Sequence, residues 1–250
     1  MDRKHVRFSA RRGGTLHRAI GLLDLLPREL CLVGGTAVVI QVAASDQGRL
    51  PRTHSWGVTV DVDALTREMP LVHEKLSILA VNHRGEGLYT MPGGLHVDVI
   101  ETTSLASLLD TDWEFASGLE LAVLAHAFAN TTAEFIDVTA VDEATGERLT
   151  GATGIQVASV IGLIVMKAAT SQVRREPKRF VDLVDLAWLL NVWSQEQITP
   201  EFPSQLTGTV TSALDEFRQP RILSRLRYDT EGVLEVDRTA EMFRSALAKR

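Results

Sequence analysis

The stretch LCLVGGTAVVIQVAA, residues 30–44, specifies much of the fold that we predict. Leu30–Val33 has the composition of a short buried strand, Gly34-Gly35 ends that strand, and Thr36–Ala44 follows as a helix. The first turn of a helix presents free backbone N–H groups and partial positive charge, and glycine lets a phosphate approach the backbone. The stretch therefore predicts a strand–turn–helix unit that is able to bind a phosphate. A plain turn capped by Thr36 is the alternative.

The segments on either side of this unit predict further strands and helices. Towards residue 150 we expect a helix at Thr15–Leu26, a polar loop at Gly48–Ser55, a strand at Gly57–Asp63 and a helix at Pro70–Ala80. A hairpin of Leu88–Met91 and Leu95–Ile100 and a strand pair around Asp142–Glu147 follow. After about Gly154 the pattern becomes helical, with helices expected at Ser159–Ala168, Phe180–Trp193, Ser204–Phe217 and Thr239–Ala248. We therefore predict an α/β (α+β) fold, with a mixed-sheet core and flanking helices in residues 1–150 and a helical domain in residues 151–250.

The composition is that of a globular chain with a full hydrophobic core. Of 250 residues, 45% are hydrophobic and 23% charged, which argues against a disordered chain. The net charge of −6 excludes a generically basic nucleic-acid coat, so any polyanion must bind a local basic patch. The single cysteine, Cys31, cannot form an internal disulfide. No apolar run approaches the roughly 18 residues of a membrane span, and we identify no signal peptide. We expect a cytoplasmic protein with no membrane partner.

Two carboxylates on one predicted strand are the first candidate site. Asp61 and Asp63 are two residues apart, so both side chains leave a strand on the same face. Adjacent carboxylates repel each other unless a cation is shared between them, and Mg²⁺ is the simplest such cation. Asp98 lies on a second predicted strand and would either complete a pocket for one or two metal ions or act as the general base. Taken alone, the pair also fits a solvated strand face, because acidic-x-acidic pairs recur at Asp112/Glu114 and Glu235/Asp237.

The order of these motifs resembles that of a known superfamily. The segments LVGGTAVVI (32–40), TVDVDAL (59–65) and HVDVIE (96–101) follow the order found in nucleotidyltransferases with the DNA polymerase β-like fold. The later stretch VASVIGLIVMKAATSQVRREPKRFVDLVDLAWLL (157–190) is similar to the AbiEii/AbiGii branch, the toxin components of bacterial toxin–antitoxin and abortive-infection systems. The resemblance covers most of residues 30–190.

The resemblance implies a role for each matching residue. It assigns nucleotide binding to Gly34, Gly35 and Thr36 of the glycine turn, and metal binding to Asp61, Asp63 and Asp98. It assigns phosphate binding to the helix residue Lys167 and a catalytic role to Asp182. Among them Asp61, Asp63, Asp98, Lys167 and Asp182 would form the catalytic set. The implied cofactor is Mg²⁺ or Mn²⁺, with a nucleoside triphosphate as substrate.

The residues of the helical half also have structural interpretations. Lys167 lies among apolar neighbours, so it must either reach solvent or find a counter-charge. A basic group, Arg174, Arg175, Lys178 and Arg179, fits contacts to the phosphates of a nucleotide or an RNA acceptor, or a solvated loop. Asp182 and Asp185 share a helix face, and Asp182 either pairs with a basic residue of this loop or acts in catalysis.

Three functions are therefore compatible with the sequence. The first is an Mg²⁺-dependent nucleotidyltransferase that transfers a nucleoside monophosphate from the triphosphate to an acceptor. The resemblance implies that this acceptor is the 3′ end of tRNA and that the enzyme is a toxin restrained by an antitoxin protein. The second is a nucleotidyltransferase that modifies a small molecule such as an antibiotic. The third is a nucleotide-binding or protein-interaction module that has lost activity.

Overall fold

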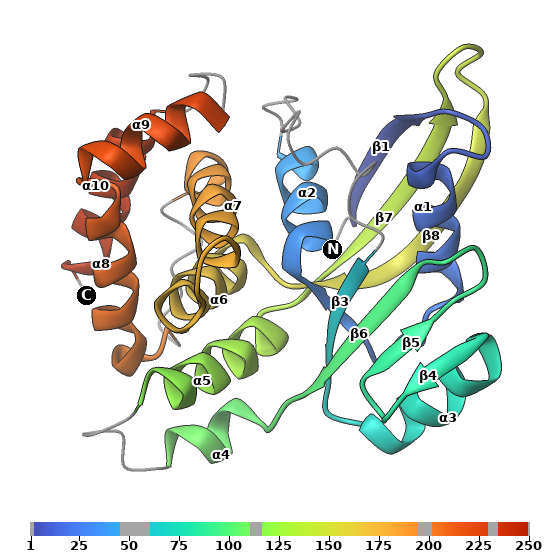
Figure 1. The fold of residues 1–250 in the computed structure, drawn as a ribbon, viewed down its shortest axis with the longest axis horizontal. Coiled ribbons are helices and arrows are strands. Elements are labelled where there is room, and N and C mark those ends of the chain that lie inside the picture. The colour runs from blue at the N-terminus through green and yellow to red at the C-terminus, as the bar shows by residue number, and fades with distance from the viewer. Residues whose placement is uncertain (1–2, 46–60, 111–116, 195–201, 230–234, 250) are drawn as a thin grey trace. The chain divides into compact units, whose positions relative to one another are not determined.

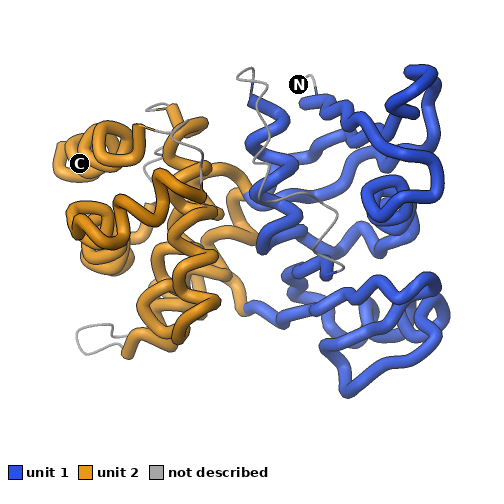
Figure 2. The backbone as a smooth tube through the Cα atoms, turned by 45° about the horizontal axis from the view of Figure 1, so that its top comes forward, with its two compact units in different colours: residues 1–50, 54–102, 133–158 blue, residues 51–53, 103–132, 159–250 orange. Residues whose placement is uncertain are grey.

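The computed structural model describes residues 3–45, 61–110, 117–194, 202–229 and 235–249 (Figure 1). These residues divide into two compact units (Figure 2). Unit 1 contains described residues 3–45, 61–102 and 133–158, and unit 2 contains 103–110, 117–132, 159–194, 202–229 and 235–249. The chain therefore leaves unit 1 after residue 102, returns at 133 and leaves it again after 158.

Unit 1 is built on one mixed sheet of eight strands, in the order β1-β7-β8-β2-β3-β6-β5-β4 (Figure 1). The pairs β1/β7, β2/β8 and β3/β6 are parallel, and the other neighbours are antiparallel. The strands are β1 (Lys4–Ala10), β2 (Cys31–Val33), β3 (Asp61–Thr66), β4 (Asn82–Arg84), β5 (Leu88–Thr90), β6 (His96–Glu101), β7 (Glu134–Asp142) and β8 (Arg148–Val157). Three helices belong to the same unit: α1 (Thr15–Leu25), α2 (Gly34–Ala44) and α3 (Met69–Leu79).

The predicted α+β fold is confirmed: a mixed sheet with flanking helices. One strand boundary is wrong, because β3 continues to Thr66 instead of ending at Asp63. Ala64 and Leu65 are fully buried and pair with β2 and β6, so burial and pairing extend the strand beyond its predicted end. The predicted loop 48–55 and residues 57–60 of the predicted strand lie outside the described residues.

Unit 2 is helical. Its helices are α4 (Leu105–Leu109), α5 (Gly118–Thr131), α6 (Val160–Val173), α7 (Lys178–Val192), α8 (Thr207–Glu216), α9 (Pro220–Asp229) and α10 (Val236–Leu247), with a 3₁₀ turn at Ser204–Leu206. Ser159 caps α6, since its hydroxyl oxygen accepts a hydrogen bond of 3.1 Å from the backbone N–H of Gly162. Residues 160–171 of α6 are all buried, so this helix forms the centre of the unit. Among the described helices, none has the length and apolarity needed to cross a membrane.

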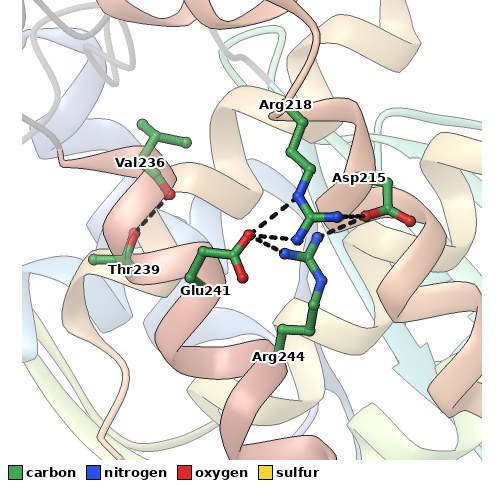
Figure 3. Close-up of polar contacts among 6 residues, drawn as sticks. All are labelled: Asp215, Arg218, Val236, Thr239, Glu241 and Arg244. Carbon is green, nitrogen blue, oxygen red and sulfur yellow. Dashed lines mark hydrogen bonds and ion pairs between the residues drawn. The ribbon is translucent and has the colours of Figure 1, made fainter.

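A closed cycle of ion pairs joins α8 to α10 (Figure 3). Arg218, just after α8, contacts Asp215 at 3.2 Å and Glu241 at 2.7 Å. Arg244 contacts Asp215 at 2.9 Å and completes the cycle at Glu241. Two arginines and two carboxylates balance each other, so the cycle adds no net charge to this face. Single exposed ion pairs contribute little to stability, whereas a network with shared partners contributes more and links α8 to α10.

Close packing of α5 against α6 generates a stability prediction. A Cβ on Gly162 would lie 2.9 Å from the Cα of Ala129 and 2.6 Å from the hydroxyl of Thr132. Gly162→Ala is therefore expected to destabilise the protein by about 1–3 kcal/mol, because the added methyl group overpacks the interface. The matched control is Gly208→Ala in α8, where no described atom lies within 4 Å of the added Cβ. That change should stabilise the helix by up to about 1 kcal/mol. Urea unfolding measures both, and equal effects of the two variants would contradict the packing.

Candidate functional site

The glycine turn lies where β2 passes into α2. Gly34 has a φ of +66°, a left-handed backbone conformation that side-chain-bearing residues rarely adopt. Val33, just before it, pairs with Asp63 in the antiparallel register of β2 and β3. Strand pairing therefore sets the turn directly beside the carboxylate pair that the sequence pattern indicates.

The Asp63 carboxylate lies against the backbone of the turn. A Cβ on Gly34 would meet Asp63 Oδ2 at 1.9 Å, so only glycine permits this approach. At Gly35, by contrast, a Cβ would have no described atom within 4 Å, which leaves the backbone of the second glycine approachable. The hydroxyl of Thr36 donates a hydrogen bond of 3.3 Å to the carbonyl oxygen of Asp61. Thr36 thus ties the start of α2 to the start of β3, and it does not cap the helix through its side chain.

Four polar side chains share one face of β3 and β6. Asp61 and Asp63 alternate with the buried Val62 and Ala64, so the two carboxylates leave the same side of β3. In the parallel register with β6, Asp61 pairs with His96 and Asp63 pairs with Asp98. Asp98 is exposed. The sheet therefore places all three predicted carboxylates on one face, in adjacent strands.

These carboxylates do not form a complete metal cage. Within the described ranges, no three His, Cys, Asp or Glu side chains are grouped closely enough to hold a metal ion. Asp98 shares a face with Asp63 but does not complete a three-ligand centre with the pair. Mg²⁺ is usually bound by one or two carboxylates together with substrate phosphates and water, rather than by an all-protein cage. A carboxylate pair beside an approachable glycine backbone fits that mode of binding.

Cys31, on β2 two residues before the strand ends, is excluded as a nucleophile. Burial raises the pKa of its thiol to about 12. The thiol therefore stays protonated at neutral pH and has little reactivity.

In unit 2, Lys167 is at the centre of a buried charge network. Its Nζ lies 3.0 Å from Asp182 Oδ1 and 2.6 Å from Asp185 Oδ2, and 5% of its side chain is exposed. Arg174 Nη1 lies 3.1 Å from each oxygen of Asp182. Burial alone would lower the pKa of Lys167, but the charges of Asp185 and Asp182 outweigh it and raise that pKa above its ordinary value. Lys167 is therefore charged, with two carboxylates as its counter-charges.

Residue types alone leave two alternatives open for Lys167 and for Asp182, and the structure shows which contacts they make within unit 2. Two carboxylates are counter-charges of Lys167, and Asp182 pairs with both Lys167 and Arg174 of the loop between α6 and α7. Asp185 is the partner that residue types did not reveal, although its position one helical turn after Asp182 was a usable signal.

Two members of the predicted basic group form ion pairs, and two form none among the described residues. Arg174 binds the buried Asp182, and Arg179 pairs with Glu216 at 2.7 Å. Arg175 and Lys178 are exposed, and they form no ion pair among the residues that the structure describes.

Comparisons with known proteins identify no relative of this chain. No model of a known protein family, no curated protein and no solved structure matches the chain. The function must therefore be inferred from the residues of this chain and from the resemblance of its motifs.

The contact between Gly34 and Asp63 predicts different effects for the two glycines of the turn. Gly34→Ala is expected to lower the free energy of unfolding by about 1–3 kcal/mol, because it combines a left-handed backbone with a collision against Asp63. Gly35→Ala is the matched control and should change it by less than about 1 kcal/mol. Urea unfolding of both variants tests the geometry. A Gly34→Ala protein as stable as Gly35→Ala would show that Asp63 does not lie against the turn.

The buried network predicts a large cost for removing its lysine. Lys167→Met leaves Asp182 and Asp185 buried without their shared cation, so we expect a loss of about 3–5 kcal/mol in unfolding free energy. The control in the same unit is Arg238→Met, because Arg238 is 72% exposed and pairs with the exposed Glu235. Arg238→Met should lower the unfolding free energy by no more than about 1 kcal/mol. Chemical denaturation compares the two, and similar small losses would contradict the network.

Proposed function

We propose that this chain is a nucleotidyltransferase that transfers a nucleoside monophosphate from a nucleoside triphosphate to an acceptor. The observation that carries the proposal is the contact between the glycine turn and the carboxylate pair in unit 1. At Gly35 no described atom blocks the approach of a phosphate to the backbone, and Asp61 and Asp63 start the adjacent strand. Phosphate-binding backbone beside paired carboxylates is what phosphoryl transfer requires, because this chemistry depends on positioning and charge neutralisation.

The residues of the turn and of the sheet have separate roles in this proposal. The backbone N–H groups at the start of α2 bind the triphosphate. One divalent ion, Mg²⁺ or Mn²⁺, would be held by Asp61 and Asp63 and would neutralise phosphate charge. Asp98 accepts the proton of the acceptor hydroxyl. The hydroxyl oxygen forms a bond to the α-phosphorus, the bond from this phosphorus to the bridging oxygen breaks, and pyrophosphate leaves.

The resemblance to the AbiEii/AbiGii branch extends the proposal to an acceptor and a biological role. The acceptor would be the 3′ end of tRNA, and the protein would be a toxin of the cytoplasm restrained by an antitoxin. The acceptor contacts expected in the sequence are Arg174, Arg175, Lys178 and Arg179. Of these, Arg175 and Lys178 support such a role best, because both are exposed and make no ion pair among the described residues.

The proposed contact between Lys167 and the phosphates carries an additional requirement. The ammonium group of Lys167 is shared by Asp182 and Asp185, so it must leave one carboxylate before it can bind a phosphate. We therefore assign the main phosphate contacts to the glycine turn. Phosphate binding by Lys167 and catalysis by Asp182 remain predictions of the resemblance.

A second candidate function is a nucleotide-binding module without transfer activity. The observation that favours it is that no three-ligand metal group occurs among the described residues. Calorimetry with each nucleoside triphosphate and Mg²⁺, followed by a pyrophosphate-release assay over a broad set of acceptors, separates the two functions. Binding without pyrophosphate release would favour the inactive module.

Asp61→Asn tests the proposed enzyme directly. The substitution removes one negative charge from the pair, so transfer of labelled nucleotide to total RNA should fall by at least about a hundredfold. Asp24→Asn makes the same chemical change at an exposed position of α1 and should leave transfer unchanged. Circular dichroism and thermal unfolding verify that both variants fold. Undiminished transfer by Asp61→Asn would reject the assignment of the carboxylate pair.

A further inference from the structure

Two segments of unit 2 concentrate positive charge in a chain whose net charge is −6. Residues 174–179 contain four basic side chains and one carboxylate, which gives a net charge of +3. Residues 218–229 have the same balance, with four arginines and one aspartate. Carboxylates of other segments balance about half of these cations, whereas Arg175, Lys178 and Arg221 form no ion pair among the described residues and are available to a polyanion.

Arg225 of α9 joins the two segments into one surface. Its guanidinium lies 3.6 Å from the centroid of the Phe180 ring, which is buried in α7. The same side chain lies 3.9 Å from Glu176 in the loop that precedes α7. Because Arg225 contacts both the loop and the first turns of α7, the basic loop and α9 form a continuous surface within unit 2. Stacking on Phe180 also holds the guanidinium in place while 53% of the side chain stays exposed.

One face of α9 carries the side chains that suit a nucleic acid. Arg221, Arg225 and Tyr228 follow at intervals of four and three residues, so they share one face of the helix. All three are exposed, and Tyr228 is 83% exposed, whereas Leu226 on another face is fully buried. An aromatic ring on a basic helix face offers a base-stacking platform next to cations that bind phosphates.

We propose that single-stranded RNA binds to this surface, which we call the α9 surface and which consists of Arg175, Lys178, Arg221, Arg225 and Tyr228. Arginine and lysine contact the phosphates, and the ring of Tyr228 stacks on an unpaired base. Arg174, Arg218 and Arg227 are left out, because each already binds a carboxylate: Asp182 for Arg174, the ion-pair cycle of Figure 3 for Arg218 and Asp237 for Arg227. An acidic protein would also match the charge, but an exposed ring between cations favours unpaired bases that stack on it.

The inference rests on the proposed function, because it assigns to one surface the RNA that serves as acceptor. Its test is a binding measurement without a nucleoside triphosphate, so RNA binding and nucleotide transfer are measured separately. The full chain is titrated into a fluorescein-labelled single-stranded RNA of twelve nucleotides at low salt, and anisotropy gives the Kd. Asp61→Asn protein should bind this RNA as tightly as wild type.

Two sets of variants separate charge from stacking. Arg221→Gln/Arg225→Gln should weaken binding and make the slope of log K against log salt shallower by about 0.7 for each phosphate that is no longer neutralised. Arg84→Gln, at an exposed position of β4 in unit 1, removes a charge elsewhere and should leave the Kd unchanged. Tyr228→Ala should weaken binding by about tenfold, whereas Tyr228→Phe retains the ring and the affinity. Because Tyr228 is so exposed, its variants should unfold at the wild-type temperature.

Several results would overturn the proposal. The proposal is wrong if the wild-type chain does not bind the RNA, or if the double arginine variant binds it with wild-type affinity. It is also wrong if Tyr228→Ala and Tyr228→Phe bind with equal affinity, or if the same RNA annealed into a duplex binds as tightly as the single strand. Displacement of the RNA by an equal charge concentration of poly-glutamate would identify an acidic protein as the partner instead. A chain that transfers nucleotide but passes none of the binding tests rejects the α9 surface alone, and a chain that binds RNA but transfers nothing rejects the enzyme alone.

Discussion

The approach of the Asp63 carboxylate to the backbone of Gly34 is the constraint that creates the candidate site. A side chain at position 34 would occupy the space that Asp63 Oδ2 fills, and the left-handed backbone at this residue already favours glycine. The antiparallel pairing of Val33 with Asp63 brings the two residues together, and the bond from Thr36 to the Asp61 carbonyl holds the helix start on the strand. Local turn chemistry and sheet pairing thus produce one site from residues about thirty positions apart.

The charged side chains of unit 2 lie in three different environments. Lys167, Asp182 and Asp185 are buried, so each charge must have a partner, and together they link the centre of α6 to α7. The cycle of Asp215, Arg218, Glu241 and Arg244 is more exposed and joins α8 to α10 with less energy per contact (Figure 3). The basic loop and α9 differ from both, because several of their cations are exposed and form no ion pair among the described residues. That contrast is why we assign binding to the α9 surface and structural roles to the other charges.

Much of the fold was predictable, because it depends on patterns within single segments. Ser159 begins α6 as a capping residue should, and the glycine-rich turn of residues 92–94 joins β5 to β6. The first strand, β1, was missed because its charged residues concealed the alternation of Val6, Phe8 and Ala10 with exposed positions. Its partner β7 lies about 130 residues later, a distance at which no local pattern reports pairing. The end of β3 was misplaced for a similar reason, since pairing with β2 and β6 extends it.

Three features follow from the amino-acid order without any coordinates: the class of fold, the succession of glycine turn and carboxylates, and the common face of Asp61 and Asp63, which the period of a strand sets. Three others emerge only when the chain is folded. Asp63 lies against Gly34, Asp98 pairs in register with Asp63 without completing a metal cage among the described residues, and Lys167 is shared by two aspartates. These outcomes depend on sheet register and on helix packing, which join residues far apart in the chain. A periodic pattern predicts the direction in which a side chain points, and only the packing of the folded chain determines which residues that side chain contacts.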